Sequence, residues 1–243
     1  MPGPEVNSVL RAVRDARRLL VITGAGVSAQ SGVPTFRDPN GWWKTHRPED
    51  LATQAAFDKD PAEVWRWYEL RRDIIHRAEP NAAHRALARA EATGARVAIV
   101  TQNVDDLHER AGSGEILHVH GSIWQLKCVV DGSIYEDRQV PLPEIPPRCP
   151  RGHIARPNVV WWGEGLDPEI TARAGCLVNE PFDVLLVVGT EATFEYIRQW
   201  ALRAKARGAL LVEVNPRVTS LTPDVDHRIA GEAGEALDAL LPG

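Results

Sequence analysis

Side chains able to carry out proton chemistry gather behind one apolar run of this sequence. Gln102, Asn103 and Asp105 follow residues 97–101 directly, and His118 and His120 come shortly after them. A histidine with a pKa near neutrality can act as a general base when an amide and a carboxylate share its site. A lone histidine is more often a hydrogen-bonded structural group, which is the alternative for His120. The spacing therefore favours a general-base site.

A glycine-rich loop, GAGVSAQSGVPTFRD at 24–38, follows the apolar run 19–22. A buried strand that turns sharply into a helix aims free backbone N–H groups at phosphate. Gly24 and Gly26 could instead simply form a tight turn. The third glycine falls at Gly32, and no strand ending in Asp or Glu follows about 20 residues later, so an ordinary dehydrogenase is a poor fit.

Four apolar runs, at 19–23, 97–101, 184–188 and 210–214, alternate with helix-like segments. This pattern predicts an α/β fold with a Rossmann-like, doubly wound parallel sheet whose strand tips converge on one crevice. Residues 38–94, with a tryptophan-rich helical part, and residues 122–157, rich in proline, interrupt the pattern. We expect these insertions to form a smaller domain, and 1–37, 95–121 and 158–243 to form the large one.

Composition narrows the class of protein. The 243 residues carry a net charge of −5, which provides no basic footprint for nucleic acid or a membrane surface. Three cysteines do not make a disulfide framework, charged residues interrupt any apolar leader, and no apolar stretch reaches the roughly 20 residues that span a bilayer. We expect a cytoplasmic protein; the composition leaves its oligomeric state open.

The ordered motifs GAGVSAQSGVPTFRD, TQNVDDLHERAG, HGS and VVWWGE resemble the sirtuin family of NAD-dependent protein deacylases, from about Leu19 to Asn215. The resemblance implies that NAD is consumed as a co-substrate. The acyl-lysine oxygen would displace nicotinamide, and His120 would then act as the base that helps a ribose hydroxyl attack the resulting imidate. Water would release lysine and acyl-ADP-ribose.

The resemblance also implies roles for other residues. Asn103 would position ribose and water, Asp105 would hold the nicotinamide amide, and Gln102 would bond the ribose. The remaining implied NAD contacts come from the glycine loop, where Phe36 would cover the nicotinamide ribose and Arg37 would supply charge, and from two later strand tips: Gly24, Ala25, Gly26, Ser28, Thr35, Phe36, Arg37, Gly189, Thr190, Glu191 and Asn215.

Two segments bear on the acyl-lysine substrate. Tyr68 and Arg71 are three residues apart, which places them on one face of a helix. The pair resembles the Tyr-x-x-Arg by which one class of sirtuins binds a malonyl or succinyl carboxylate; alternatively, the arginine is solvated and the tyrosine packs. VVWWGE, with Val160, Gly163 and Glu164, resembles the family's strand that pairs with the substrate backbone.

Two departures from the family pattern concern metal and NAD. Where the family has two Cys-x-x-C pairs for zinc, one cysteine of each remains, and Cys128, Asp131, Cys149 and His153 could complete a tetrahedral site. A metal-free lobe held by proline-rich packing is the equal alternative. VGTEATFEYI replaces the family's Gly-Thr-Ser followed by Val-x-Pro, so Glu191 would accept ribose hydroxyls or repel the diphosphate, and Arg217 could offset its charge.

The sequence thus predicts an NAD-dependent deacylase acting on acylated lysines of proteins, with acidic acyl groups favoured and simple deacetylation as the rival within the class. Hydrolysis of NAD or ADP-ribosyl transfer is a second enzymatic reading. A non-catalytic sensor of NAD or ADP-ribose is a third, motivated by Glu191 and the eroded cysteine pairs.

Overall fold

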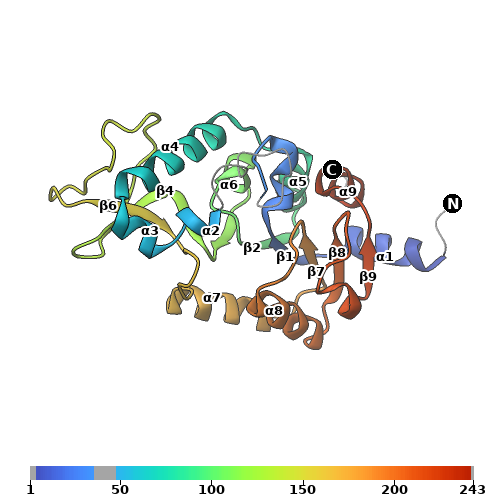
Figure 1. Cartoon of the computed structure of the whole chain (residues 1–243). Coiled ribbons are helices and arrows are strands. Elements are labelled where there is room, and N and C mark those ends of the chain that lie inside the picture. Colours follow the sequence, from blue (N-terminus) through green and yellow to red (C-terminus); the bar gives the residue numbers. More distant parts are fainter. Residues whose placement is uncertain (1–3, 36–47, 242–243) are drawn as a thin grey trace.

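The computed structural model describes residues 4–35 and 48–241, and its largest element is a six-stranded parallel sheet (Figure 1). The strand order is β3-β2-β1-β7-β8-β9. The strands are β1 (Arg18–Thr23), β2 (Arg96–Thr101), β3 (Glu115–His118), β7 (Val184–Val188), β8 (Leu210–Val214) and β9 (His227–Ile229). The four predicted strands are all present, and the Rossmann-like fold class is confirmed.

The central strands are apolar because helices cover both faces of the sheet. In β7 all five residues are buried, as expected for a parallel strand packed on two sides. Figure 1 shows α7 (Pro168–Asn179) and α8 (Glu195–Ala206) beneath the sheet. The other face packs against α1 (Pro4–Asp15), α5 (Ala82–Ala92) and α9 (Ala233–Leu240).

A three-stranded antiparallel sheet lies apart from the first, with the order β5-β4-β6. It consists of β4 (Gly121–Cys128), β5 (Ile134–Glu136) and β6 (Ala155–Val159). Its apolar side packs with α3 (Gln54–Lys59) and α4 (Pro61–Arg77), through a core that includes Trp65, Ile123 and Trp161. Short elements complete the described chain: α2 (Pro48–Leu51), α6 (Leu107–Ala111), η1 (Ala25–Val27), η2 (Ala29–Ser31) and η4 (Thr222–Asp224).

The helix that carries the predicted acyl anchor has a well-formed start. The side chain of Asp60 accepts a hydrogen bond from the N–H of Glu63, and Pro61 occupies the first turn, where its missing N–H costs nothing. The helix runs for 17 residues and buries Trp65 and Tyr68 on its inner face. This fixes the direction in which the neighbouring Arg71 projects.

The order of the large sheet locates its ligand crevice. From β1 the chain proceeds outward to β2 and β3 on one side, while β7, β8 and β9 extend on the other. In open α/β sheets the ligand crevice lies where the order reverses, which here is at the carboxyl ends of β1 and β7. The predicted limits of the large and small domains stay a prediction.

Candidate active site

The glycine loop and the tip of β7 meet at the crevice through backbone contact. A Cβ at Gly26 would lie 2.8 Å from the Cα of Gly189, and one at Gly24 would lie 2.7 Å from the Cβ of Thr190. Only glycine allows the two loops to approach this closely. The close packing explains the two early glycines.

The loop differs from its prediction in two respects. The chain after β1 forms two short 3₁₀ turns, η1 and η2, in place of a regular helix. Moreover, the N–H of Gly24 donates to the carbonyl of Val188, that of Gly26 to Gly189, and that of Ser28 to Ala25. The expectation of free N–H groups is wrong for these three residues, because the loop folds back on itself and on β7.

Ser28 joins the loop to the tip of β2. Its hydroxyl donates to Oδ2 of Asp105 at 3.0 Å and accepts from Nδ2 of Asn103 at 3.1 Å. The buried ring of His84 lies 3.5 Å away through Nε2. The structure therefore brings the serine together with an amide and a carboxylate that lie 75 and 77 residues further along the sequence.

Burial dominates the electrostatics of this cluster. It raises the pKa of Asp105, although hydrogen bonds from the Leu107 N–H and the Ser28 hydroxyl act in the opposite direction. In either protonation state, the Asp105 carboxyl group has an oxygen atom that can accept a hydrogen bond from an amide N–H.

His120 is held with its Nε2 as the proton-accepting atom. Its Nδ1 lies 2.9 Å from the carbonyl oxygen of Gln102, and because a carbonyl can only accept, Nδ1 carries the proton. Burial lowers the pKa of His120, partly offset by this hydrogen bond. The imidazole is therefore neutral at neutral pH with Nε2 as its basic nitrogen, and the hydroxyl of Tyr196 lies 2.5 Å from it.

His118, two residues earlier, serves a different purpose. Its Nδ1 lies 2.9 Å from the carbonyl of Asn103, and its Nε2 lies 2.6 Å from Oε1 of Glu109. Burial lowers the pKa of His118, but the contacts with Glu109 outweigh it and raise the pKa overall. His118 thus holds the Asn103 carbonyl at the tip of β2, and His120 is the histidine that faces the crevice.

The opposite end of the crevice contains the later strand tips. Nε2 of Gln102 donates to Oγ1 of Thr190 at 2.9 Å, and Nδ2 of Asn215 donates to the Thr190 carbonyl at 3.0 Å. Arg217 lies 3.3 Å from Oε1 of Glu191. The arginine that could offset the carboxylate is thus in contact with it, which weakens repulsion of a diphosphate.

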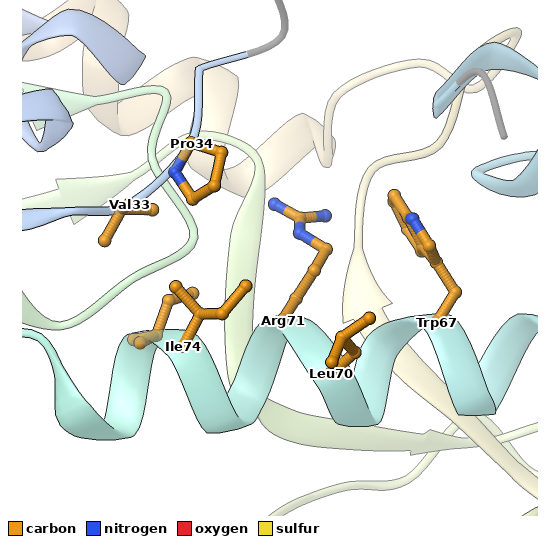
Figure 2. Close-up of a pocket in the computed structure, with 7 residues that line it drawn as sticks. Val33, Pro34, Trp67, Leu70, Arg71 and Ile74 are labelled. Carbon is orange, nitrogen blue, oxygen red and sulfur yellow. The ribbon is translucent and has the colours of Figure 1, made fainter. Parts of the chain in front are cut away.

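An apolar pocket lies between α4 and the end of the glycine loop (Figure 2). Its empty volume is about 360 Å³ when the solvent at its mouth is included, and it is lined by Val33, Pro34, Trp67, Leu70, Arg71, Ile74 and Ile75. Figure 2 shows Arg71 extending from the helix toward Pro34, beside Trp67. The guanidinium of Arg71 lies 4.8 Å from the Trp67 ring centroid. Burial lowers the pKa of Arg71 overall, although Tyr68 and Asp105 act in the opposite direction.

Tyr68 lies behind this pocket. It is buried, and its hydroxyl accepts a hydrogen bond from the Trp161 indole at 2.9 Å. Its ring is 5.5 Å from the Arg71 guanidinium. The two residues therefore share one face of α4 as predicted, with Arg71 at the pocket and Tyr68 supporting it.

The prediction of a strand at 159–164 is wrong beyond Val159, because β6 ends there and the chain turns at residues 162–163. The N–H of Val160 donates to the His120 carbonyl, and Gly163 has the left-handed φ of +87° that the turn requires. The carboxylate of Glu164 accepts from the Trp161 N–H at 2.8 Å and pairs with Arg156. Glu164 thereby fixes the turn next to His120.

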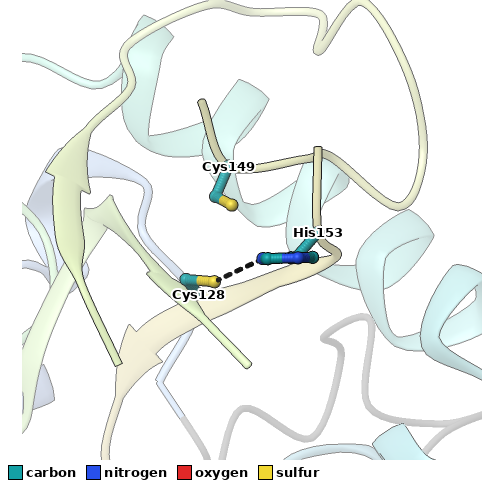
Figure 3. Close-up of side chains that lie close together, drawn as sticks. All are labelled: Cys128, Cys149 and His153. Carbon is teal, nitrogen blue, oxygen red and sulfur yellow. Dashed lines mark hydrogen bonds between the residues drawn. The ribbon is translucent and has the colours of Figure 1, made fainter. Parts of the chain in front are cut away.

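Three of the four predicted metal ligands cluster at the far end of the small sheet (Figure 3). The ligand atoms of Cys128, Cys149 and His153 lie within 4.8 Å of one another, with Sγ of Cys128 3.8 Å from Nδ1 of His153. Two sulfur atoms and one imidazole nitrogen are ligands that zinc prefers, and they could bind the ion by moving slightly closer together. The carboxylate of Asp131 instead receives hydrogen bonds from Ser133 and Arg151.

Several residues stand apart from the sequence-based expectations. Phe36 and Arg37 lie outside the described residues, and Thr35 is the last residue before that gap. Tyr196 and Trp67 contact the predicted base and the predicted anchor but were not singled out. Their only sequence signal is an aromatic residue on a helix, which more often indicates packing.

This arrangement defines a class of protein: a doubly wound sheet with a nucleotide crevice and a neutral histidine beside it. The chain matches the Sir2 family over residues 24–195, more than half its length, and belongs to that family. It is 43% identical over 97% of its length, and 96% of the relative's, to NAD-dependent protein deacylase 1 of Archaeoglobus fulgidus. It is also 44% identical to NAD-dependent protein deacylase 1 of Pseudomonas aeruginosa, over 97% of this chain and 98% of that protein.

A solved structure of a Sir2 homologue in complex with NAD superimposes on the chain with a TM-score of 0.90. That protein is 42% identical, and the match covers 97% of this chain and 92% of the other. A Sir2 variant bound to a deacetylated p53 peptide and 3′-O-acetyl ADP-ribose gives a TM-score of 0.84 at 28% identity, over 97% and 96% of the two chains.

Proposed function

We propose that this chain removes acyl groups from protein lysines with consumption of NAD, preferring succinyl and malonyl groups and forming nicotinamide and O-acyl-ADP-ribose. The chain is an enzyme of the Sir2 family, and its relatives at 43–46% identity are NAD-dependent protein deacylases. NAD is the co-substrate, as in the related NAD complex. The single observation that carries the mechanism is the neutral, half-buried His120 whose Nε2 faces the crevice.

The roles of the crevice residues follow from their contacts. Loss of nicotinamide builds positive charge on the ribose, which a preorganised, poorly hydrated site can stabilise. His120 then accepts a proton from a ribose hydroxyl through Nε2, because its Nδ1 is bound to Gln102. Asn103 and Asp105, fixed by Ser28, position the ribose and the nicotinamide amide.

The preference for acidic acyl groups rests on Arg71. A guanidinium in an otherwise apolar pocket can bind a carboxylate through charge-assisted hydrogen bonds that an acetyl group does not offer. Tyr68 supports this group from behind, 5.5 Å away. The substrate is thus an extended protein segment with an acidic acyl-lysine that reaches the pocket, with Val160, Gly163 and Glu164 beside its backbone.

Zinc would be held by Cys128, Cys149 and His153, and Asp131 would complete the site only by giving up its hydrogen bonds from Ser133 and Arg151. Burial raises the pKa of Cys149, but hydrogen bonds involving the Arg151 and His153 backbones and the Cys128 side chain outweigh it, so the pKa of Cys149 is lowered overall, while the pKa of the neighbouring Cys128 is raised. Bound there, the ion would tie the end of β4 to the turn at 149–153. Its contribution would be to stability, since the cluster belongs to the small sheet.

The proposal is tested with His120→Ala, compared with His76→Ala, which changes an exposed histidine on α4. With NAD and a succinyl-lysine peptide, His120→Ala should lose acyl-ADP-ribose formation while retaining NAD binding and exchange of labelled nicotinamide into NAD, because the base acts after nicotinamide leaves. His76→Ala should match the parent protein. Undiminished acyl-ADP-ribose formation by His120→Ala would refute the assigned role.

A further inference from the structure

One contact of the predicted base is unexplained by the proposed reaction. The hydroxyl of Tyr196, in the first turn of α8, lies 2.5 Å from Nε2 of His120. Since Nδ1 carries the proton, Nε2 offers its single lone pair, and the phenol must be the donor. The atom that should receive the substrate's proton therefore already accepts a hydrogen bond from the protein.

The phenol is held in this position by packing. Its ring stacks on Phe194, with 5.5 Å between centroids and 16° between planes, and contacts Trp200 at 5.1 Å. Phe194 in turn meets the edge of the His120 ring at 5.6 Å. Burial raises the pKa of Tyr196 well above its ordinary value, so the hydroxyl keeps its proton.

We propose that Tyr196 is a positioning residue that caps Nε2 of His120 between turnovers, and that a ribose hydroxyl can give its proton to His120 only after displacing the phenol. The inference rests on the proposed role of His120 as the base. Tyr196 lies in the stretch, 188–197, that departs from the family pattern.

The cap makes a quantitative prediction about pH. A hydrogen bond donated to the neutral imidazole stabilises that form and so lowers the pKa of His120. It also makes most enzyme molecules with a neutral His120 unreactive, because their Nε2 is occupied by the phenol. Removing it raises the rate at high pH and moves the acidic limb to higher pH. At low pH, where protonated His120 dominates, the cap is absent in both proteins and the rates converge.

The two changes are linked because one equilibrium produces both. The rate at high pH should increase by the factor by which the cap reduces the fraction of uncapped neutral His120. The midpoint of the acidic limb should move to higher pH by the decimal logarithm of that same factor. For an ordinary neutral hydrogen bond, the plateau should rise about three- to tenfold and the limb should move by about 0.5–1 pH unit.

Other ionisable groups around His120 do not confuse this prediction. Its pKa is set by burial and by the Gln102 carbonyl, without a contribution from any charged side chain in the described parts of the chain. Asp105, on the same strand tip, is bonded to Ser28 and to the Leu107 N–H, and His118 is bonded to Glu109. On α8, the group that faces the imidazole is Tyr196 itself.

The test is Tyr196→Phe, which removes the hydroxyl and keeps the stacked ring. The rate of acyl-ADP-ribose formation is measured between pH 5 and 9 in single turnovers with saturating NAD and succinyl-lysine peptide, alongside nicotinamide exchange. Tyr135→Phe is the matched control, since the Tyr135 hydroxyl is buried in the small domain and has no hydrogen-bond partner among the described residues.

A plateau gain matched by the shift of the limb, with nicotinamide exchange unchanged, is the expected result. An unchanged profile, or a gain without the shift, would overturn the cap. A rate that falls at every pH would place the phenol on the proton path and would also overturn it. If His120→Ala still formed product, the proposed function would fail instead, so the two failures are distinguishable.

Discussion

The acyl preference depends most directly on Arg71, and Arg71→Met is the substitution that isolates it. Methionine keeps an unbranched side chain of similar reach in the apolar pocket but has no charge. Two unit charges 4 Å apart attract by about 4 kcal/mol at an effective dielectric constant near 20, and desolvation consumes part of this. Hydrogen bonds to charged groups contribute about 1.5–3 kcal/mol net.

A loss of about 2–3 kcal/mol in transition-state binding corresponds to a reduction of about 30- to 150-fold in kcat/KM for a succinyl-lysine peptide. Deacetylation should change by less than about threefold, because an acetyl group makes no charged contact. Parallel kinetics with succinyl, malonyl and acetyl peptides measure the difference.

Arg66→Met is the matched control. Arg66 lies on the same helix, its side chain is 63% exposed, and its nearest carboxylate oxygen, on Asp60, is 3.9 Å away. This variant should leave all three activities unchanged. Equal losses of desuccinylation and deacetylation in Arg71→Met would show that Arg71 supports the helix without binding the acyl carboxylate, and would refute the anchor.

Three further predictions concern stability, NAD and metal. Burial lowers the pKa of His84 from 6.5 to about 4, so the unfolded chain binds more protons than the folded one between these pH values. The free energy of unfolding should therefore fall by about 3 kcal/mol as the pH drops through this range. In urea unfolding, the stability of His84→Asn should depend less steeply on pH than that of the parent protein, and equal pH dependences would contradict the assignment. Gly26→Ala places a Cβ 2.8 Å from Gly189 and should weaken NAD binding about tenfold or more by calorimetry. Gly175→Ala, in α7 with no atom within 4 Å of its Cβ, should retain affinity, and equal affinities of the two variants would refute the close-packing argument. Cys128→Ser should lower both bound zinc and the melting temperature relative to the exposed Cys176→Ser, and zinc-free parent protein on elemental analysis would contradict the site.

The sheet could be predicted because its strands are buried on both faces. Continuous apolar runs such as Val184–Val188 permit few other placements, and the polar residues after them converge because parallel strands end at one edge. Ser28, Asn103 and Asp105 therefore meet as the motifs suggested. No described helix is long and apolar enough to cross a membrane.

What escaped prediction depends on backbone groups and on contacts between distant segments. The Gln102 carbonyl that selects the tautomer of His120 has no signature in residue type. Tyr196 lies 76 residues from His120 and looks like an ordinary core aromatic until α8 is docked. The N–H groups of Gly24 and Gly26 were expected to be free, but they donate to the carbonyls of Val188 and Gly189 at the end of β7, because buried backbone groups need partners.

Asp131 illustrates a limit of spacing arguments. It occupies the position at which a second cysteine would stand in a Cys-x-x-Cys pair, yet Ser133 and Arg151 compete for its carboxylate. A short polar side chain in a turn readily bonds to the backbone two residues on. Spacing alone therefore could not distinguish a ligand from a turn-forming residue.

Mass spectrometry of the products formed from NAD and a succinyl-lysine peptide tests the central claim most directly. The account predicts O-succinyl-ADP-ribose, free lysine peptide and nicotinamide in equal amounts. Steady loss of NAD to ADP-ribose and nicotinamide, with the succinyl-lysine peptide intact, would contradict it.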